Sequence, residues 1–355
     1  MSGTASPDPV FSPLHAVHER LGARFTEFAG WTLPVHYQGT LSEHAAVRSS
    51  VGVFDVSHLG RFECSGPGAT EALRWLFCND IATIEPGRAQ YTMMLTYDGG
   101  VLDDLIVWRW DNDRYWVLPN GVNHHRVMSG VAAADGLTVV DRRVETALIA
   151  VQGPQAPRLV EETLGSTPKR FRVLEAEFAG FPVWAAGTGY TGERGAEVAI
   201  SAEAAPRLFD ALLEGGAVAC GLGARDVLRL EMGYPLWGAD LDTATTPIEA
   251  GFEWVVEWDH DFVGRRALAA QRSSGPPKRR IGFVTEGRAI PRPGCLVRCG
   301  PATGFVASGT FSPTLQAGIG VAYVSPDPGN ETGVTVDIRG RRVEATRADP
   351  PFIER

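Results

Sequence analysis

The chain has 355 residues, of which 44% are hydrophobic and 21% are charged, and its formal net charge is -9 at pH 7. This length exceeds what one small core needs and favours roughly two or three domains. The negative charge argues against non-specific binding of nucleic acid, which requires a basic surface, so we expect no nucleic-acid partner.

Other classes of protein are disfavoured by what the chain lacks. No apolar run approaches the roughly 18 residues that a membrane span requires. Residues 1–9 have neither the basic nor the apolar region of an export signal, which favours a cytoplasmic protein with no membrane contact. The five cysteines are scattered and odd in number, as in reduced proteins without a disulfide framework. No Cys or His grouping has the spacing of a zinc site, so we expect no bound metal.

The N-terminal part of the chain alternates between helical and extended patterns, which is typical of an α+β fold. Apolar residues recur at helical spacing from residue 13 onward. The predicted elements are helices over residues 13–25, 42–50 and 69–77 and strands over residues 51–59 and 61–64.

A tight hairpin is predicted at Asp98-Gly99-Gly100, because two apolar, β-rich runs flank this turn sequence. The returning strand carries Asp103 and Asp104 in succession. Successive side chains on a strand point to opposite faces, so one carboxylate must share the face of the apolar neighbours. A charge in that position is costly unless it is paired, hydrogen-bonded or used in chemistry. The alternative is a strand end at which both carboxylates are solvated or cap a neighbouring turn.

Alternating strands and helices continue up to a polar segment at residues 271–278, which is rich in Pro and Gly and is the best candidate for a linker. After it, short strands separated by turns indicate a small barrel. The whole chain is therefore predicted to be α+β with a C-terminal β domain. The strands predicted before the linker lie at residues 115–119, 147–151 and 181–200, the last of these interrupted by glycine-rich turns at residues 187–189 and 192–195. The predicted helices lie at residues 120–131, 154–164, 204–214 and 223–232.

A glycine-rich segment at residues 187–198 brings an aromatic ring and a carboxylate to one rim, because glycine permits sharp turns and close backbone approach. Tyr190 could stack on a planar ligand, and Glu197 could accept hydrogen bonds from the N–H edge of an amidine-like group. The alternative is a glycine-rich hairpin with a tyrosine in the core.

Two arginines, Arg225 and Arg229, lie one turn apart in the helix predicted over residues 223–232. They could bind an anionic group, or they could pair with Asp226 and Glu231. The local pattern leaves both interpretations open.

A set of short segments occurs in a fixed order along nearly the whole chain. These segments are Phe28-Ala29-Gly30-Trp31, Val53-Phe54-Asp55-Val56-Ser57-His58, Gln90-Tyr91-Thr92, Gly99-Gly100-Val101-Leu102-Asp103-Asp104-Leu105, Leu148-Ile149-Ala150-Val151-Gln152-Gly153-Pro154, Gly189-Tyr190-Thr191-Gly192-Glu193 and Ser308-Gly309-Thr310-Phe311-Ser312-Pro313. Together they resemble the glycine cleavage system T-protein family, the tetrahydrofolate-dependent aminomethyltransferases. No single motif decides this, but the collinear set is specific.

The resemblance implies an α+β fold with a three-lobed arrangement around a central folate-binding hole and a C-terminal β-barrel. A discontinuous α+β folate-binding lobe is expected over residues 1–50 plus 145–270. A second α+β lobe, which carries the Asp98 hairpin, is expected over residues 51–144, and the barrel over residues 279–355.

The resemblance also implies an activity and a site. The family transfers the methylene carbon of an aminomethyl group on the dihydrolipoyl arm of the H-protein to tetrahydrofolate, which gives 5,10-methylene-tetrahydrofolate and ammonia. Tetrahydrofolate is the co-substrate, the lipoylated H-protein is the partner, and no metal takes part. Carried over by motif, Asp104 is the catalytic carboxylate. The residues expected to bind tetrahydrofolate are Tyr91, Asp104, Asn120, Tyr190, Glu197 and Arg225.

The chain departs from the family pattern in places that concern the carbon donor. The family usually reads Asn-Ala-Ala-Asn where this chain has Asn120-Gly121-Val122-Asn123, followed by an unusual His124-His125 pair, and Trp237 stands where a tyrosine is common. One alternative is therefore a folate-dependent demethylase or one-carbon transferase that acts on a small N- or O-methyl substrate. Another is a non-catalytic folate-binding scaffold, against which the retention of Asp104 argues.

Overall fold

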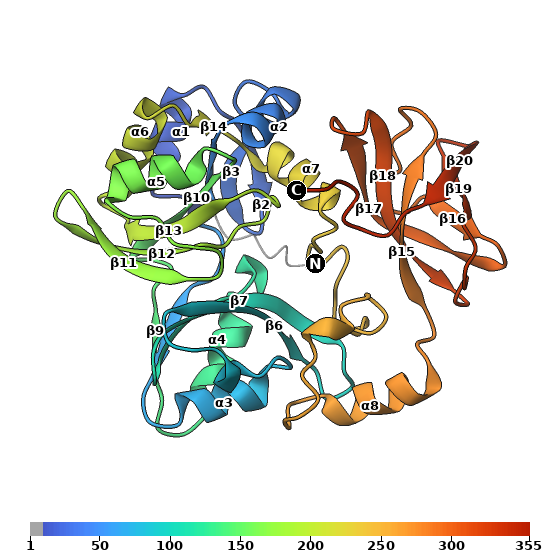
Figure 1. The fold of residues 1–355 in the computed structure, drawn as a ribbon, viewed down its shortest axis with the longest axis horizontal. Coiled ribbons are helices and arrows are strands. Elements are labelled where there is room, and N and C mark those ends of the chain that lie inside the picture. The colour runs from blue at the N-terminus through green and yellow to red at the C-terminus, as the bar shows by residue number, and fades with distance from the viewer. Residues whose placement is uncertain (1–9) are drawn as a thin grey trace, which may run out of the picture.

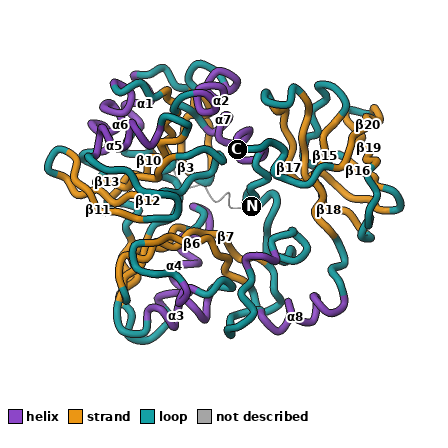
Figure 2. Tube along the Cα trace, viewed as in Figure 1, coloured by secondary structure: helices purple, strands orange, loops and turns teal. Residues whose placement is uncertain are grey.

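The computed structural model describes residues 10–355 and arranges them as three lobes around a common centre (Figure 1). The predicted α+β class with a C-terminal barrel is confirmed. Figure 2 shows that helices accompany the sheets of two lobes, whereas the third lobe is built from strands and loops. The first nine residues of the predicted folate-binding lobe lie outside the described residues.

The first lobe is built on a six-stranded sheet with the order β11-β12-β13-β10-β4-β14. Its strand β10 (Thr146–Gln152) is buried along its whole length between β13 (Gly195–Ser201) and β4 (Gly52–Asp55). The strands of this sheet therefore come from both sides of the predicted lobe boundary at residue 51. The other three strands are β11 (Val173–Phe178), β12 (Phe181–Ala186) and β14 (Val218–Ala219).

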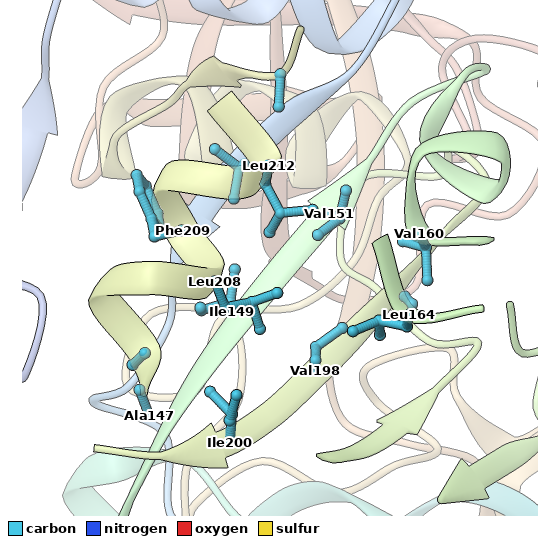
Figure 3. Packing of buried hydrophobic residues seen from close by; sticks show 14 of the residues in the cluster. Ala147, Ile149, Val151, Val160, Leu164, Val198, Ile200, Leu208, Phe209 and Leu212 are labelled. Carbon is cyan, nitrogen blue, oxygen red and sulfur yellow. The ribbon is translucent and has the colours of Figure 1, made fainter. Parts of the chain in front are cut away.

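Both faces of this sheet are covered, which is why β10 reads as a continuous apolar run. Helices α5 (Ala156–Leu164) and α6 (Ala205–Glu214) cover one face, and alternate residues of β10 point toward them (Figure 3). The other face packs against α2 (Thr40–Ser49), α7 (Leu222–Glu231) and the second lobe. Residues that Figure 3 labels on the first face include Ala147, Ile149, Val151, Leu208, Phe209 and Leu212.

The second lobe carries a five-stranded antiparallel sheet with the order β6-β7-β8-β5-β9. Helices α3 (Ala69–Leu76) and α4 (His124–Ala132) pack on one face, and Trp108 and Trp116 on the other face pack against the first lobe. The strands are β6 (Arg88–Leu95), β7 (Val101–Asp111), β8 (Arg114–Leu118), β5 (Phe62–Ser65) and β9 (Thr138–Asp141).

The predicted hairpin at Asp98 joins β6 to β7. Gly99 has a φ of +84°, a conformation that side chains with a Cβ rarely adopt. At Gly100 a Cβ atom would lie 1.9 Å from the carbonyl oxygen of Thr243. The turn therefore requires both glycines, one for its backbone angle and one for the close approach of another segment.

The third lobe is a closed antiparallel barrel in which β15 pairs with both β18 and β20. Its interior is apolar and includes Phe283, Val297 and Val324. The strands, in order around the barrel, are β15 (Arg279–Thr285), β18 (Ala317–Ser325), β17 (Ala302–Ser312), β16 (Leu296–Cys299), β19 (Gly333–Ile338) and β20 (Arg341–Arg347).

The predicted helix over residues 13–25 is wrong in its second half. α1 spans only His15–Arg20, and after Gly22, which has a φ of +72°, the chain enters strand β2 (Arg24–Phe28). The apolar stripe predicted a helix there, but pairing with a neighbouring strand decided the conformation. The other strands of this small sheet are β1 (Val10–Phe11) and β3 (Trp31–His36).

The predicted linker at residues 271–278 is likewise partly helical. Helix α8 (Arg265–Ser274) runs into it and ends before Gly275, whose φ is +82°. Glycine at the end of a helix is a common C-terminal signal, so only the last part of the segment connects to the barrel. Within residues 10–355, no helix is both long and apolar enough to cross a membrane.

Candidate active site

The two adjacent carboxylates of β7 face opposite sides of the second sheet. Asp103 is fully buried, whereas Asp104 is partly exposed. They pair in register with Met94 and Met93 of β6. The alternation predicted from the sequence therefore places one carboxylate inside the lobe and the other on the face toward the centre of the molecule.

Asp104 is held by two donors. The hydroxyl of Tyr91 donates to Asp104 Oδ2 at 3.0 Å, and the side-chain amide of Asn120 donates to Oδ1 at 3.0 Å. Burial raises the pKa of Asp104 to about 6, while both hydrogen bonds act in the opposite direction. A carboxylate that titrates so close to neutral pH is suited to handling a proton.

Asp103 holds the turn that carries Asn120. It accepts hydrogen bonds from the backbone N–H of Asn120 at 3.0 Å, from its side-chain amide at 2.9 Å and from Asn123 at 2.8 Å. Burial and the charge of Asp104 raise the pKa of Asp103 well above its usual range. Asn123 was not among the predicted site residues. Its position at the end of the turn that begins at Asn120 is the signal that could have found it.

Tyr91 presents its ring to the exposed side of the site. It stacks on Trp254, with ring centroids 6.0 Å apart, and 70% of the Trp254 surface is exposed. Burial, followed by the charge of Asp104, raises the pKa of Tyr91 well above its usual range, so the phenol stays protonated and acts as a donor. Sequence reasoning missed Trp254, because it lies more than 150 positions from Tyr91 and no local pattern joins the two.

Tyr190 lies in the loop between β12 and β13. Its hydroxyl donates to the backbone carbonyl of Pro235, and its ring stacks on Tyr234 at 5.8 Å. The guanidinium of Arg225 lies over the same ring, 4.6 Å from its centroid. The charge of Asp104 contributes, after burial, to raising the pKa of Tyr190, so the electrostatics of this loop and of β7 are coupled.

Arg225, which lies over the ring of Tyr190, is close enough to the opposite charge of Glu197 to feel it. Glu197 is buried in β13 and accepts a 2.6 Å hydrogen bond from the hydroxyl of Thr188. Arg225 is 9% exposed, and among residues 10–355 no group accepts a hydrogen bond from its buried Nη1. Burial lowers the pKa of Arg225, while the charge of Glu197 raises it. A buried guanidinium nitrogen without an acceptor is costly, so the arrangement favours a polar ligand at this point.

Residues 14–260 match the family model described as the GCVT N-terminal domain. Residues 278–354 match the model of the glycine cleavage T-protein C-terminal barrel domain. The chain belongs to the glycine cleavage T-protein family.

Individual relatives agree over the full length of the chain. The aminomethyltransferase of Frankia alni is 45% identical, over 96% of this chain and 97% of that protein. The aminomethyltransferase of Mycobacterium tuberculosis is 43% identical, over 98% of both chains. The crystal structure of aminomethyltransferase T of the glycine cleavage system from Bartonella henselae has a TM-score of 0.90 at 31% identity and covers 97% of this chain and 98% of that one. This T-protein family member is therefore an enzyme, an aminomethyltransferase of glycine cleavage.

The two arginines of α7 have different environments in this member of the T-protein family. Arg229 is paired, with its Nε 2.9 Å from Asp226 and its Nη1 2.6 Å from Asp240. Glu231, which the sequence offered as a partner, instead contacts α2 and the barrel. The predicted pairing is thus confirmed for Arg229 with Asp226, and wrong for Glu231. Of the two arginines, Arg225 is the one with a buried nitrogen, Nη1, that has no acceptor within residues 10–355.

Proposed function

We propose that the chain transfers the methylene carbon of an aminomethyl group on the dihydrolipoyl arm of an H-protein to tetrahydrofolate. The bonds from this carbon to sulfur and to the amino nitrogen break, and bonds to two folate nitrogens form. The protons of those two nitrogens end on the dihydrolipoyl thiol and on the ammonia that leaves. Tetrahydrofolate supplies the nucleophilic amine, and the products are 5,10-methylene-tetrahydrofolate and ammonia.

The residues at the centre fit a reduced pterin. Tyr91 and Tyr190 offer aromatic rings, and Glu197 is a buried carboxylate that matches an amidine-like N–H edge. The Nη1 of Arg225 lacks an acceptor among residues 10–355 and matches a carbonyl oxygen. We propose that these side chains bind the pterin, with Asn120 fixing the carboxylate of Asp104 against it.

Asp104 is the proposed catalytic residue. With a pKa of about 6 it is mostly ionised at neutral pH, and its orientation is set by the donors Tyr91 and Asn120. An ionised carboxylate in that position would orient the attacking amine of tetrahydrofolate and stabilise the positive charge that develops on it. The contact of Asp104 with Tyr91 and Asn120 is the observation that carries this proposal.

The departures from the family pattern do not favour a small methylated substrate. Trp237 donates its indole N–H to the backbone carbonyl of Val101 at 3.2 Å, and His124 is fully buried. Both side chains therefore contact the protein itself, and neither marks a new donor pocket. A cytoplasmic location is part of the same proposal and is supported by the five cysteines, which are free thiols.

The partner can be tested with the purified enzyme and tetrahydrofolate. We expect 5,10-methylene-tetrahydrofolate and ammonia to form in equal amounts from aminomethylated H-protein, and no product from small N-methyl or O-methyl compounds. Product from a small methylated donor, with none from H-protein, would refute the proposal and favour the demethylase. Absence of folate-dependent product from every donor would favour the scaffold.

A further inference from the structure

We propose that His124 and Asp141 are positioning residues, which hold the Asn120–Asn123 turn and thereby the carboxylate of Asp104. This inference rests on the function proposed for Asp104. His124 is the first residue of α4 and directly follows the turn. It is fully buried, and its Nε2 lies 3.0 Å from Asp141 Oδ2 at the end of β9. Because a carboxylate only accepts, the imidazole donates from Nε2.

The second oxygen of Asp141 is also used. It accepts a 2.8 Å hydrogen bond from the backbone N–H of Arg143. The guanidinium of Arg143 in turn donates to the carbonyl of Gly121 at 3.4 Å, and it lies over the ring of Trp31, 4.9 Å from the centroid. The segment that begins at Asp141 therefore contacts Gly121 within the turn and His124 directly after it, and it links both to Trp31 of β3.

Steric contacts leave the turn little room to move. A Cβ atom at Gly121 would lie 2.1 Å from the carbonyl oxygen of His58, and one at Gly60 would lie 2.6 Å from Pro119 and 2.8 Å from His124 Nδ1. That Nδ1 is buried and has no hydrogen-bond partner in the described part of the chain. The imidazole of His124 therefore contributes one hydrogen bond, from its Nε2, and the packing of its ring. It cannot relay a proton, because its Nδ1 has no partner in the described residues.

The consequence for Asp104 follows from the hydrogen bonds of Asn120. Its amide contacts both carboxylates at 2.9–3.0 Å, so a small displacement of the turn would break them. The bond from Asn120 lowers the pKa of Asp104 against the effect of burial. Loss of the His124–Asp141 contact should therefore raise the pKa of Asp104 and misorient its carboxylate, without removing any group that touches substrate.

Hydrogen exchange tests the positioning directly, because it needs no activity. The backbone N–H of Asn120 donates to Asp103, and that of Asn123 donates to Asn120. In His124→Leu we expect both amides to exchange about tenfold faster than in the parent, since local opening becomes easier when such a contact is lost. In His124→Gln, whose amide can replace the Nε2 donor, exchange should return toward the parent. The control is His125→Leu at the exposed neighbouring position, which should leave exchange unchanged.

Steady-state kinetics then separate positioning from a merely structural role. In His124→Leu we expect kcat to fall about tenfold with little change in KM for tetrahydrofolate, and the acid limb of the kcat–pH profile to move to higher pH. Asp141→Ala removes the other partner of the His124–Asp141 contact and should give the same fall in kcat and the same shift of the acid limb. Because Asp141 is partly exposed, this variant remains a test if His124→Leu does not fold. Parental exchange and a parental acid limb in the folded variants would overturn the inference.

The two proposals fail in different ways. If Asp104→Asn retains parental turnover, the function proposed for Asp104 is wrong, while the exchange result still decides whether His124 holds the turn. If Asp104→Asn loses turnover but His124→Leu and Asp141→Ala behave as the parent, only the positioning inference is wrong.

Discussion

Tyr91 donates a 3.0 Å hydrogen bond to Asp104 from the neighbouring strand of the same hairpin. The register pairs Tyr91 with Ile106 and Met93 with Asp104, so the two side chains are diagonal neighbours on one face. A donor and an acceptor are thus brought together by local pairing alone. The other residues of the candidate site, which include Asn120, Tyr190 and Arg225, lie on other segments of the chain.

Replacing each carboxylate of β7 separately distinguishes the catalytic one from its neighbour. Asp104→Asn keeps size and polarity but removes the charge, so we expect turnover to fall about 10²–10⁴-fold with folding intact. Asp103→Asn should affect the rate less and disturb the Asn120–Asn123 turn more, because Asp103 accepts three bonds from it. Single-turnover formation of methylene-tetrahydrofolate from aminomethylated H-protein compares them. Loss of turnover in Asp103→Asn alone would show that the wrong carboxylate has been assigned.

The pH dependence of kcat should report the hydrogen bond from Tyr91. In the proposed mechanism Asp104 works in its ionised form, so the rate should fall as the pH drops through about 6. Tyr91→Phe removes a donor to that ionised form, which raises the pKa and moves the acid limb upward by about 1 unit. Profiles from pH 5 to 8 measure it, with Tyr97→Phe at an exposed position as the control. An acid limb that stays in place would show that Tyr91 does not tune Asp104.

Binding of the pterin should depend on Glu197. Glu197→Gln removes a charged acceptor while keeping its shape, so we expect affinity for tetrahydrofolate to fall roughly tenfold to a hundredfold. Calorimetry in the presence of a metal chelator measures this and checks that the parent binds without metal or nucleotide. The control is Arg194→Gln, a substitution at an exposed position of the same loop, which should leave the affinity unchanged. Unchanged affinity in Glu197→Gln would assign this residue a structural role with Thr188.

Stability toward acid should depend on Glu231, which joins α7 to two other elements. It accepts from His44, Arg48 and Ser312. Although burial alone would raise the pKa of Glu231, these hydrogen bonds lower it from 4.5 to about 2. Because the pKa of Glu231 is lower in the folded than in the unfolded state, its ionisation stabilises the fold at pH values above the unfolded-state pKa of about 4.5. This stabilisation is lost as the pH falls from about 4.5 toward 2. The full contribution is about 3 kcal/mol.

Denaturant unfolding at pH 6 and pH 3 tests this linkage. Glu231→Gln should be destabilised at pH 6 and should lose much of the parental drop in stability between the two values. The matched control is Glu162→Gln, which removes an exposed carboxylate from a surface pair and should keep the parental drop. Equal pH dependence in Glu231→Gln and the parent would contradict the assignment.

Local chemistry explains how much could be predicted from the sequence. The hairpin at Asp98 and the opposite orientation of Asp103 and Asp104 follow from turn residues and the two-residue period of a strand, neither of which needs distant contacts. The barrel was predictable in the same way, from short strands and turns. The boundary between α1 and β2 was not, because pairing of β2 with β3 overrode the apolar stripe. The end of α8 was missed although Gly275 is itself a local signal for the end of a helix.

Only the tertiary structure decided which of the buried charged side chains are paired within the protein. Arg225 and Arg229 are both arginines of helix α7. Asp240, which lies beyond the helix, pairs with Arg229. By contrast, Nη1 of Arg225 has no acceptor in the described residues. In the same way, the buried imidazole of His124 finds its hydrogen-bond partner, Asp141, on the distant strand β9. A sequence specifies which groups a chain carries and how neighbours alternate. Whether a buried charge is paired depends on segments far away in the chain, since electrostatic interactions are set by distance and desolvation.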